Sequence, residues 1–201
     1  MRDRRRSVAH PGLREAYKRF VRGALTDADH AELDVVDGLA GRLREHLVDS
    51  AADIDSVHVH RAQSSAVQSI VARLLTEKLG FDQEVVLTPS EGFATSTRPD
   101  FIFRLSDGRG VLAEVERGGT TTNNHDLKDL WKTHIASDAH HLFLVVPHAN
   151  WNAAGQAREK PFVRVSRRLA AFFGDPRREV DVMSLHLFGY GQAPLPPTQL
   201  H

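Results

Sequence analysis

Two short runs of alternating apolar residues, joined by a glycine-containing turn, constrain the fold of this chain more than any other stretch. The first run follows Pro99 and Asp100. Apolar side chains occupy every second position in both runs: Phe101, Phe103 and Leu105 in the first, and Val111, Ala113 and Val115 in the second. Because side chains on a strand alternate between its two faces, each run predicts a strand with one buried face. Together they predict an antiparallel hairpin.

The shared apolar face restricts the register of this hairpin. Residue numbers paired across the strands must sum to an even value, and a sum of 216 places Asp100 opposite Glu116. A sum of 218 makes Gly108-Arg109-Gly110 the loop, with glycine where a three-residue hairpin needs left-handed backbone. Both registers place Asp100, Glu114 and Glu116 on one face, whereas a slip by one residue would turn the apolar set outward. The pattern therefore gathers three carboxylates at one end of the hairpin.

Three converging carboxylates repel one another, so a purely stabilising role is hard to assign to them. Their hard oxygen ligands suit Mg²⁺ or Mn²⁺. The alternative is a set of solvated charges on an exposed sheet face, where most charged residues lie. The Pro99-Asp100 pair that opens the hairpin and the restricted register favour the metal site.

The order Pro99-Asp100, hairpin, Glu114-x-Glu116 resembles the PD-(D/E)xK nuclease superfamily, which includes many restriction endonucleases. The resemblance implies that Asp100 and Glu114 bind Mg²⁺ or Mn²⁺, with the main-chain carbonyl of Val115 as a further ligand. The chain departs from the family at Glu116, because a lysine that orients or deprotonates the attacking water usually stands there. A few restriction enzymes of the superfamily carry Glu or Gln instead. Glu116 would then complete the catalytic set by holding water or contacting a second ion.

The segments around the hairpin follow the order of the core of that superfamily. Apolar periodicity predicts a helix over residues 62–79, a strand over 84–87, a helix capped by Asn123 or Asn124, and a strand over His141–Pro147. The last strand has five unbroken apolar residues, which fits an interior position with both faces buried. The resulting α-β-β-β-α-β order predicts an α/β fold, with a restriction-endonuclease-like mixed central sheet flanked by helices.

Segments before and after this core are also predicted to be helical or extended. Two helices, over residues 13–25 and 29–48, form an N-terminal helical extension covering residues 1–56. This extension would enlarge a DNA surface, build a dimer contact or cover a sheet edge. The nuclease-like core spans residues 57–190 and includes a helix over 162–173 and a strand over 180–188. A proline-containing, loosely ordered tail covers residues 191–201.

Polar residues close to the acidic motif are candidates for contact with nucleic acid or metal. Arg117, Asn123 and Asn124 follow the second hairpin strand. Arginine pairs with phosphate or guanine, and asparagine pairs with adenine. In the superfamily that the chain resembles, a side chain from the first core helix often reaches the metal through water. Gln63 and Gln68 are the candidates for this role, and ordinary surface glutamines are the alternative.

Two lysines on the helix that follows are further candidates. Lys128 and Lys132 lie one turn apart, on the face opposite Leu127 and Trp131, which we expect to point inward. From that face the two lysines would bind phosphate, or would supply the active site with the positive charge that the motif lysine usually provides.

Composition narrows the class of protein. A chain of 201 residues with 41% hydrophobic content suits one domain with a full core, and the absence of cysteine excludes disulfides and thiolate zinc sites. No apolar run approaches the ~18–20 residues needed to span a bilayer, and no apolar signal core follows the basic N-terminus. We therefore expect a cytoplasmic protein with no membrane contact. Because the net charge is zero, a DNA-facing surface must be a local basic patch.

The resemblance thus implies a Mg²⁺-dependent endonuclease that hydrolyses phosphodiester bonds in DNA, of a restriction or defence type. It would act as a homodimer, because one such site cuts one strand. A repair or RNA-processing nuclease of the same fold is one alternative. Another is a nucleic-acid-binding module that has lost catalysis. The missing motif lysine supports the binding module, whereas three acidic residues on one face oppose it.

Overall fold

The computed structural model describes residues 17–60, 64–84, 98–105, 108–174, 177 and 180–193. The strands are β1 (Tyr17–Val21), β2 (Asp82–Gln83), β3 (Phe101–Arg104), β4 (Gly110–Val115), β5 (His141–Pro147), β6 (Asn150–Trp151), β7 (Ala157–Glu159) and β8 (Ser184–Tyr190). The helices are α1 (Asp27–Asp49), α2 (Ala51–Val57), α3 (Ser64–Leu79), α4 (His125–Ile135) and α5 (Pro161–Phe173).

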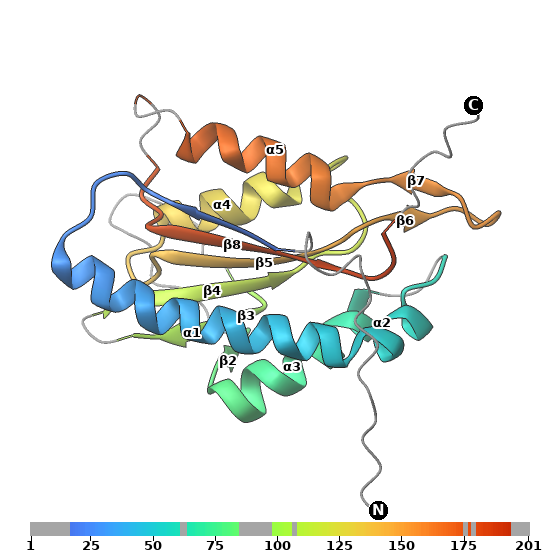
Figure 1. Ribbon diagram of the computed structural model, residues 1–201, viewed down its shortest axis with the longest axis horizontal. Coiled ribbons are helices and arrows are strands. Elements are labelled where there is room, and N and C mark those ends of the chain that lie inside the picture. The colour runs from blue at the N-terminus through green and yellow to red at the C-terminus, as the bar shows by residue number, and fades with distance from the viewer. Residues whose placement is uncertain are drawn as a thin grey trace, which may run out of the picture.

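Six of these strands form one mixed sheet in the order β1-β8-β5-β4-β3-β2, with helices on both faces (Figure 1). The three central strands β4, β5 and β8 are parallel, whereas β1, β3 and β2 pair antiparallel to their neighbours. The chain is therefore a mixed α/β protein. Since parallel strands end at the same edge of a sheet, residues that follow β4, β5 and β8 meet there, as ligand-binding residues do in open α/β sheets.

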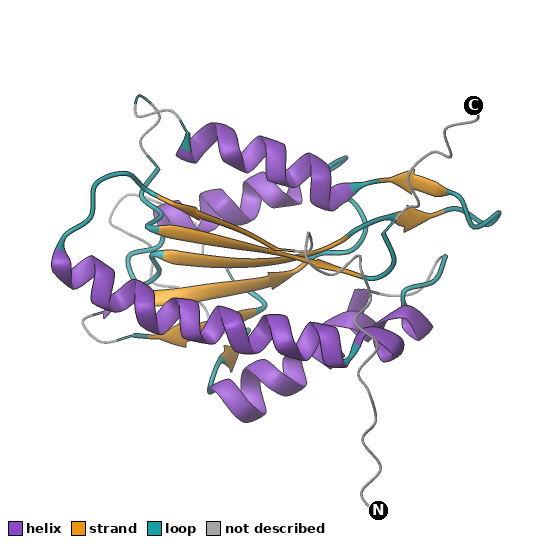
Figure 2. Cartoon of the chain, viewed as in Figure 1, coloured by secondary structure: helices purple, strands orange, loops and turns teal. Residues whose placement is uncertain are grey.

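Each face of the sheet has its own hydrophobic core. Alternate strand residues such as Phe101, Ala113 and Phe143 pack with α1 and α3, and the intervening ones, such as Ile102 and Leu112, pack with α4 and α5. Figure 2 shows the two helical layers on either side of the strands. Every residue of β4 and β5 is buried. The prediction of an interior strand over His141–Pro147 is confirmed, but the hairpin strand β4 is covered on both faces rather than one.

The hairpin has the predicted parity but a tighter register. Phe101 lies opposite Ala113 and Phe103 opposite Val111, so the paired numbers sum to 214 instead of 216 or 218. The predicted Gly108-Arg109-Gly110 loop is wrong, because Gly110 is already part of β4. Gly110 packs tightly there, since a Cβ atom would lie 2.5 Å from the main-chain oxygen of Asp138. Gly108, with a φ of +75°, supplies the left-handed backbone.

The predicted helix over residues 13–25 is wrong, because Tyr17–Val21 forms the edge strand β1, paired with β8. Tyr17 packs against the core on the α1 side of the sheet and Phe20 against the core on the other side. Two residues three apart lie on one face of a helix but on opposite faces of a strand, so the strand uses both side chains. Residues 1–16 lie outside the described part of the chain.

The helices predicted over residues 29–48 and 162–173 are confirmed as α1 and α5. Helix α1 packs across one sheet face rather than along an edge, and its apolar stripe belongs to the same core as β3, β4 and β5. The last strand, β8, begins at Ser184, four residues later than predicted. Of the strand predicted over 84–87 only Glu84 is described, and it has a φ of 51° and lies after β2. Residues 85–87 and the tail from 194 onward lie outside the described residues.

None of the helices in the described ranges is long and apolar enough to cross a membrane.

Candidate functional site

Asp100 and Glu114 lie together at the open end of the β3–β4 hairpin. The Asp100 N–H donates to Glu114 Oε2 (3.2 Å), and the Val115 N–H donates to Asp100 Oδ2 (2.9 Å). These two reciprocal bonds hold the carboxylates of neighbouring strands side by side. Glu116 follows directly, and its main-chain oxygen accepts a hydrogen bond from the Tyr190 hydroxyl (2.9 Å). The three acidic residues of the predicted motif therefore lie at the end of β4, and the charge of Asp100 acts on the carboxylate of Glu116.

A lysine from α4 reaches into this acidic group. Lys132 Nζ donates to Glu114 Oε1 (2.5 Å) and to Asp129 Oδ1 (3.2 Å), and the Lys132 side chain is only 17% exposed. Glu114 and Asp129 thus bind the ammonium directly, and its charge also acts on Asp100 and Glu116. We call Asp100, Glu114, Glu116, Asp129 and Lys132 the acidic cluster.

The orientation predicted for α4 is wrong in one respect. Trp131 was expected to point inward but is 55% exposed and contacts the His134 ring, whereas Lys132 points inward. The buried residues of α4 are mostly polar: Asp126, Asp129, Leu130 and Thr133. Asp126 pairs with Arg168 of α5 (3.0 Å). The helix therefore buries its polar face, which carries the partners of Glu114 and Arg168.

The acidic cluster has more carboxylates than cations, and its pKa values reflect this. Burial raises the pKa of Glu114 to about 8, and repulsion from Asp129 and Asp100 adds to the effect. Burial likewise raises the pKa of Asp129 to about 7. Burial alone would lower the pKa of Lys132, but Glu114 and Asp129 more than offset this and raise it. Because one ammonium offsets only part of this buried negative charge, Glu114 and Asp129 keep their protons until the pH approaches neutrality or above.

Two further side chains hold the outer carboxylates of the cluster. Gln68, which extends from α3, forms a side-chain hydrogen bond to Asp100, and His125 Nδ1 donates to Glu116 Oε2 (2.8 Å). Burial raises the pKa of both Asp100 and Glu116, while these hydrogen bonds act in the opposite direction. The other glutamine candidate, Gln63, lies outside the described residues.

The candidates for nucleic-acid contact are spread over the surface next to the cluster. Arg117 donates through Nη2 to the main-chain oxygen of Val59 (2.5 Å). Asn123, Asn124 and Lys128 are exposed. Asn124 is the N-cap residue of α4, one of the two predicted positions, but it has a φ of 55° and its side chain makes no capping bond. Its Oδ1 instead accepts a hydrogen bond from Arg168 (3.1 Å).

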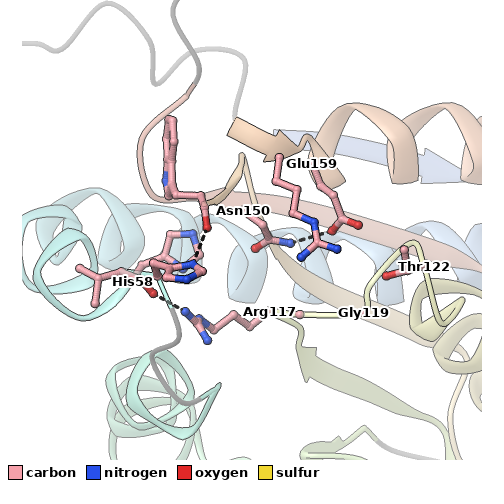
Figure 3. Close-up of a pocket in the computed structure, with 11 residues that line it drawn as sticks. His58, Arg117, Gly119, Thr122, Asn150 and Glu159 are labelled. Carbon is pink, nitrogen blue, oxygen red and sulfur yellow. Dashed lines mark hydrogen bonds between the residues drawn. The ribbon is translucent and has the colours of Figure 1, made fainter. Parts of the chain in front are cut away.

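A pocket of about 260 Å³ lies directly beyond Glu116. It is formed by three segments, residues 58–60, residues 117–122 and the β6–β7 hairpin, and Figure 3 shows how they face one another. The β6–β7 hairpin extends the chain beyond the end of β5 (Figure 1). Sequence patterns did not predict this pocket, because its walls come from segments about 90 residues apart.

The donor set of the acidic cluster fits a divalent cation by charge and by ligand type. Carboxylate oxygens are the preferred ligands of Mg²⁺ and Mn²⁺. Asp129 Oδ2 is buried and has no hydrogen-bond partner within the described ranges. Hydrogen bonds from Lys132 and main-chain N–H groups take up oxygens of Glu114 and Asp100. No three His, Asp or Glu side chains among the described residues are arranged as a ready-made metal site.

Sequence reasoning missed Asp129, although a signal for it exists. Asp126, Asp129 and Lys132 recur at intervals of three, which places them on one side of a helix. A search for the buried side of a helix looks for apolar residues, because a buried helix face is usually hydrophobic. Such a search passes over these three polar positions.

Comparisons with protein-family models, with curated proteins and with solved structures found no match to this chain. The function must therefore be inferred from the geometry and chemistry of the chain.

Proposed function

We propose that this chain is a nuclease that uses Mg²⁺ or Mn²⁺ to hydrolyse phosphodiester bonds in DNA, with a restriction-endonuclease-like fold. The observation that carries this proposal is the acidic cluster. In it the Asp100 N–H donates to Glu114 Oε2, and Lys132 Nζ lies 2.5 Å from Glu114 Oε1. Lys132, on helix α4, supplies the positive charge that a lysine at the position of Glu116 supplies in the superfamily. A restriction or defence role, a homodimer and a cytoplasmic location belong to the same proposal.

Asp100, Glu114 and the main-chain carbonyl of Val115 would hold the cation. In a strand, the N–H and C=O of one residue point to the same side. The Val115 N–H donates to Asp100, so its carbonyl is directed to the same edge of β4. A bound divalent cation supplies neutralisation of phosphate charge and a lower pKa for water. Gln68 keeps the Asp100 carboxylate oriented through its hydrogen bond.

Lys132 and Glu116 act on either side of these ligands. The Lys132 ammonium fixes one oxygen of Glu114 and places positive charge beside the position of the reacting phosphate. Glu116 Oε2 accepts from His125, which leaves Oε1 as an acceptor that orients a water molecule. Burial raises the pKa of Glu116 and the hydrogen bond from His125 acts in the opposite direction, so the part proposed for Glu116 is to position this water.

The alternative of a binding module without catalysis has its own support. Glu116 stands where the superfamily usually has lysine, and the described residues hold no ready-made group of three metal ligands. This alternative predicts nucleic-acid binding that is the same with Mg²⁺ and with EDTA, and no cleavage under either condition.

The experiment is a cleavage assay with plasmid, single-stranded DNA and RNA in Mg²⁺, Mn²⁺ or EDTA. We expect the wild type to cleave DNA with a divalent cation, and Glu114→Gln to reduce cleavage to the EDTA level. The matched control is Glu77→Gln, which makes the same change at an exposed position on α3. Equal cleavage by Glu114→Gln and wild type would refute the proposal, and cleavage of RNA alone would favour an RNA-processing nuclease.

A further inference from the structure

The pocket beyond Glu116 is built as a preformed binding site. Its three segments are tied together by hydrogen bonds to main-chain oxygens. His58 Nε2 donates to Ala149 (2.8 Å), His60 Nδ1 to Trp151 (3.1 Å) and Arg117 Nη2 to Val59 (2.5 Å). These bonds join residues 58–60 both to the end of β4 and to the β6–β7 hairpin. A ligand therefore meets walls that are already in position, which lowers the entropic cost of binding.

Two buried polar atoms on the pocket walls are without partners. His58 is 6% exposed, and its Nδ1 has no hydrogen-bond partner among the described residues. Because Nε2 donates to a carbonyl, Nδ1 of the neutral ring is an acceptor. Arg117 Nε is a buried donor that likewise lacks a partner in that part of the chain. Buried polar groups are normally paired, and both unpaired atoms belong to residues that line the pocket, so its walls are polar.

The charges on the pocket walls suit a phosphate. Arg117 and Arg158 line the pocket, and the one carboxylate among its described lining residues, Glu159, accepts a hydrogen bond from Asn150 Nδ2 (3.1 Å). Arginine binds phosphate through paired N–H donors. Figure 3 shows Arg117, Gly119 and Thr122 on one side of the pocket, with Asn150 and Glu159 on the opposite side.

The opposite wall suits a base. Trp151 lines the pocket and is half-buried, and an indole ring provides a stacking surface for any base. Glu159 and the Asn150 carbonyl oxygen are hydrogen-bond acceptors, which favour a base that carries an amino group, such as cytosine or adenine. A volume of about 260 Å³ lies just below the range of drug-sized sites and leaves room for one nucleotide.

We propose that this pocket holds one unpaired nucleotide next to the cleavage position, with its phosphate at Arg117 and Arg158 and its base on Trp151. The inference rests on the proposed nuclease for its substrate, and it specifies that substrate as DNA with a single-stranded segment at the cut. Tyr190 links the two sites, because its hydroxyl bonds the Glu116 main chain and its ring contacts His58. A base stacked in a duplex has no free face for Trp151, so it must first be unpaired to bind here.

The experiment measures nucleotide binding in EDTA, so that a failure of cleavage leaves the result unaffected. The chain has two tryptophans, and Trp131→Phe leaves Trp151 as the only one. We expect deoxycytidine monophosphate to quench Trp151 fluorescence with saturation. Arg158→Ala should weaken binding about tenfold, whereas Arg167→Ala, an exposed arginine on α5, should leave it unchanged.

Competitors identify which part of the ligand is recognised. Inorganic phosphate, deoxycytidine and thymidine monophosphate should each bind at least about fivefold more weakly than deoxycytidine monophosphate. A single-stranded oligonucleotide should displace it, and the matching blunt duplex should not. No saturable quenching, equal binding by inorganic phosphate, equal displacement by duplex, or unchanged binding in Arg158→Ala would each overturn the inference. Nucleotide binding without any cleavage would leave the pocket assignment standing and refute the nuclease.

Discussion

Lys132→Met should destabilise the protein by an amount that grows with pH. Methionine retains most of the apolar stem of lysine but removes the ammonium that bonds Glu114 (2.5 Å) and Asp129 (3.2 Å). At pH 6 both carboxylates hold protons in the folded state, since burial raises the pKa of Glu114 to about 8 and that of Asp129 to about 7. The variant then loses mainly hydrogen bonds made by a charged donor, at a cost of about 2 kcal/mol.

At higher pH the cost of Lys132→Met increases. A carboxylate whose folded pKa exceeds its unfolded value contributes stability at low pH that is lost as the pH rises through the folded pKa. Without Lys132 the pKa values of Glu114 and Asp129 in the folded state rise further. The variant therefore continues to lose stability as the pH rises above the wild-type pKa values, whereas the wild type does not. Each carboxylate adds about 1.4 kcal/mol per pH unit above its wild-type pKa. The extra cost therefore appears between pH 7 and 8 and grows to a few kcal/mol at pH 9.

Urea denaturation of both proteins at pH 6, 8 and 9 in EDTA measures this cost. The control is Lys128→Met, one turn earlier on α4 and exposed, which should change the free energy of unfolding by less than about 0.5 kcal/mol at every pH. A cost for Lys132→Met that is independent of pH would refute the description of the cluster as a lysine surrounded by excess carboxylate.

Three other predictions concern the sheet and the motif. Burial lowers the pKa of His186 to about 3, so folding excludes a proton that the unfolded chain binds below about 6.5. His186 should therefore contribute a loss of about 1.4 kcal/mol per pH unit as the pH drops below 6.5, and His186→Phe should remove this contribution from the pH dependence of the free energy of unfolding. Gly110→Ala should cost about 1–3 kcal/mol in thermal or urea unfolding, because its Cβ would lie 2.5 Å from the main-chain oxygen of Asp138; an unchanged stability would contradict that contact. Glu116→Lys should weaken metal binding and fail to raise cleavage, because it brings a second cation to the Lys132 ammonium. A variant more active than wild type at equal Mg²⁺ would exclude a catalytic role for Glu116.

The hairpin was predictable because strand parity depends only on which residues are apolar. Phe101, Phe103, Val111 and Ala113 share a face in every register of even sum, and this is enough to bring Asp100 to the same end as Glu114. The register with a sum of 214 brings Gly110 beside the main-chain oxygen of Asp138, a contact between distant segments. The residues of the hairpin do not by themselves indicate a contact with a distant segment.

The orientation of α4 and the strand nature of β1 were not predictable for related reasons. Apolar periodicity assumes that the buried side of a helix is hydrophobic, but the buried side of α4 carries Asp126 and Asp129, which pair with Arg168 and Lys132. In β1, the residues that suggested a helix are instead divided between the two faces of the sheet by pairing with β8, which lies more than 160 residues away. In both regions tertiary contacts outweigh the local pattern. The DNA substrate, the metal and the dimer remain predictions.

The central claim is that the acidic cluster binds a divalent cation, and titration calorimetry with Mn²⁺ tests it most directly. We predict about one Mn²⁺ bound per chain in the wild type, with protons released at pH 7 because buried carboxylates must ionise to bind metal. Asp100→Asn and Glu114→Gln should each abolish this binding, and Glu77→Gln should leave it unchanged. Absence of Mn²⁺ binding by the folded wild type, or equal binding by Glu114→Gln, would contradict the claim.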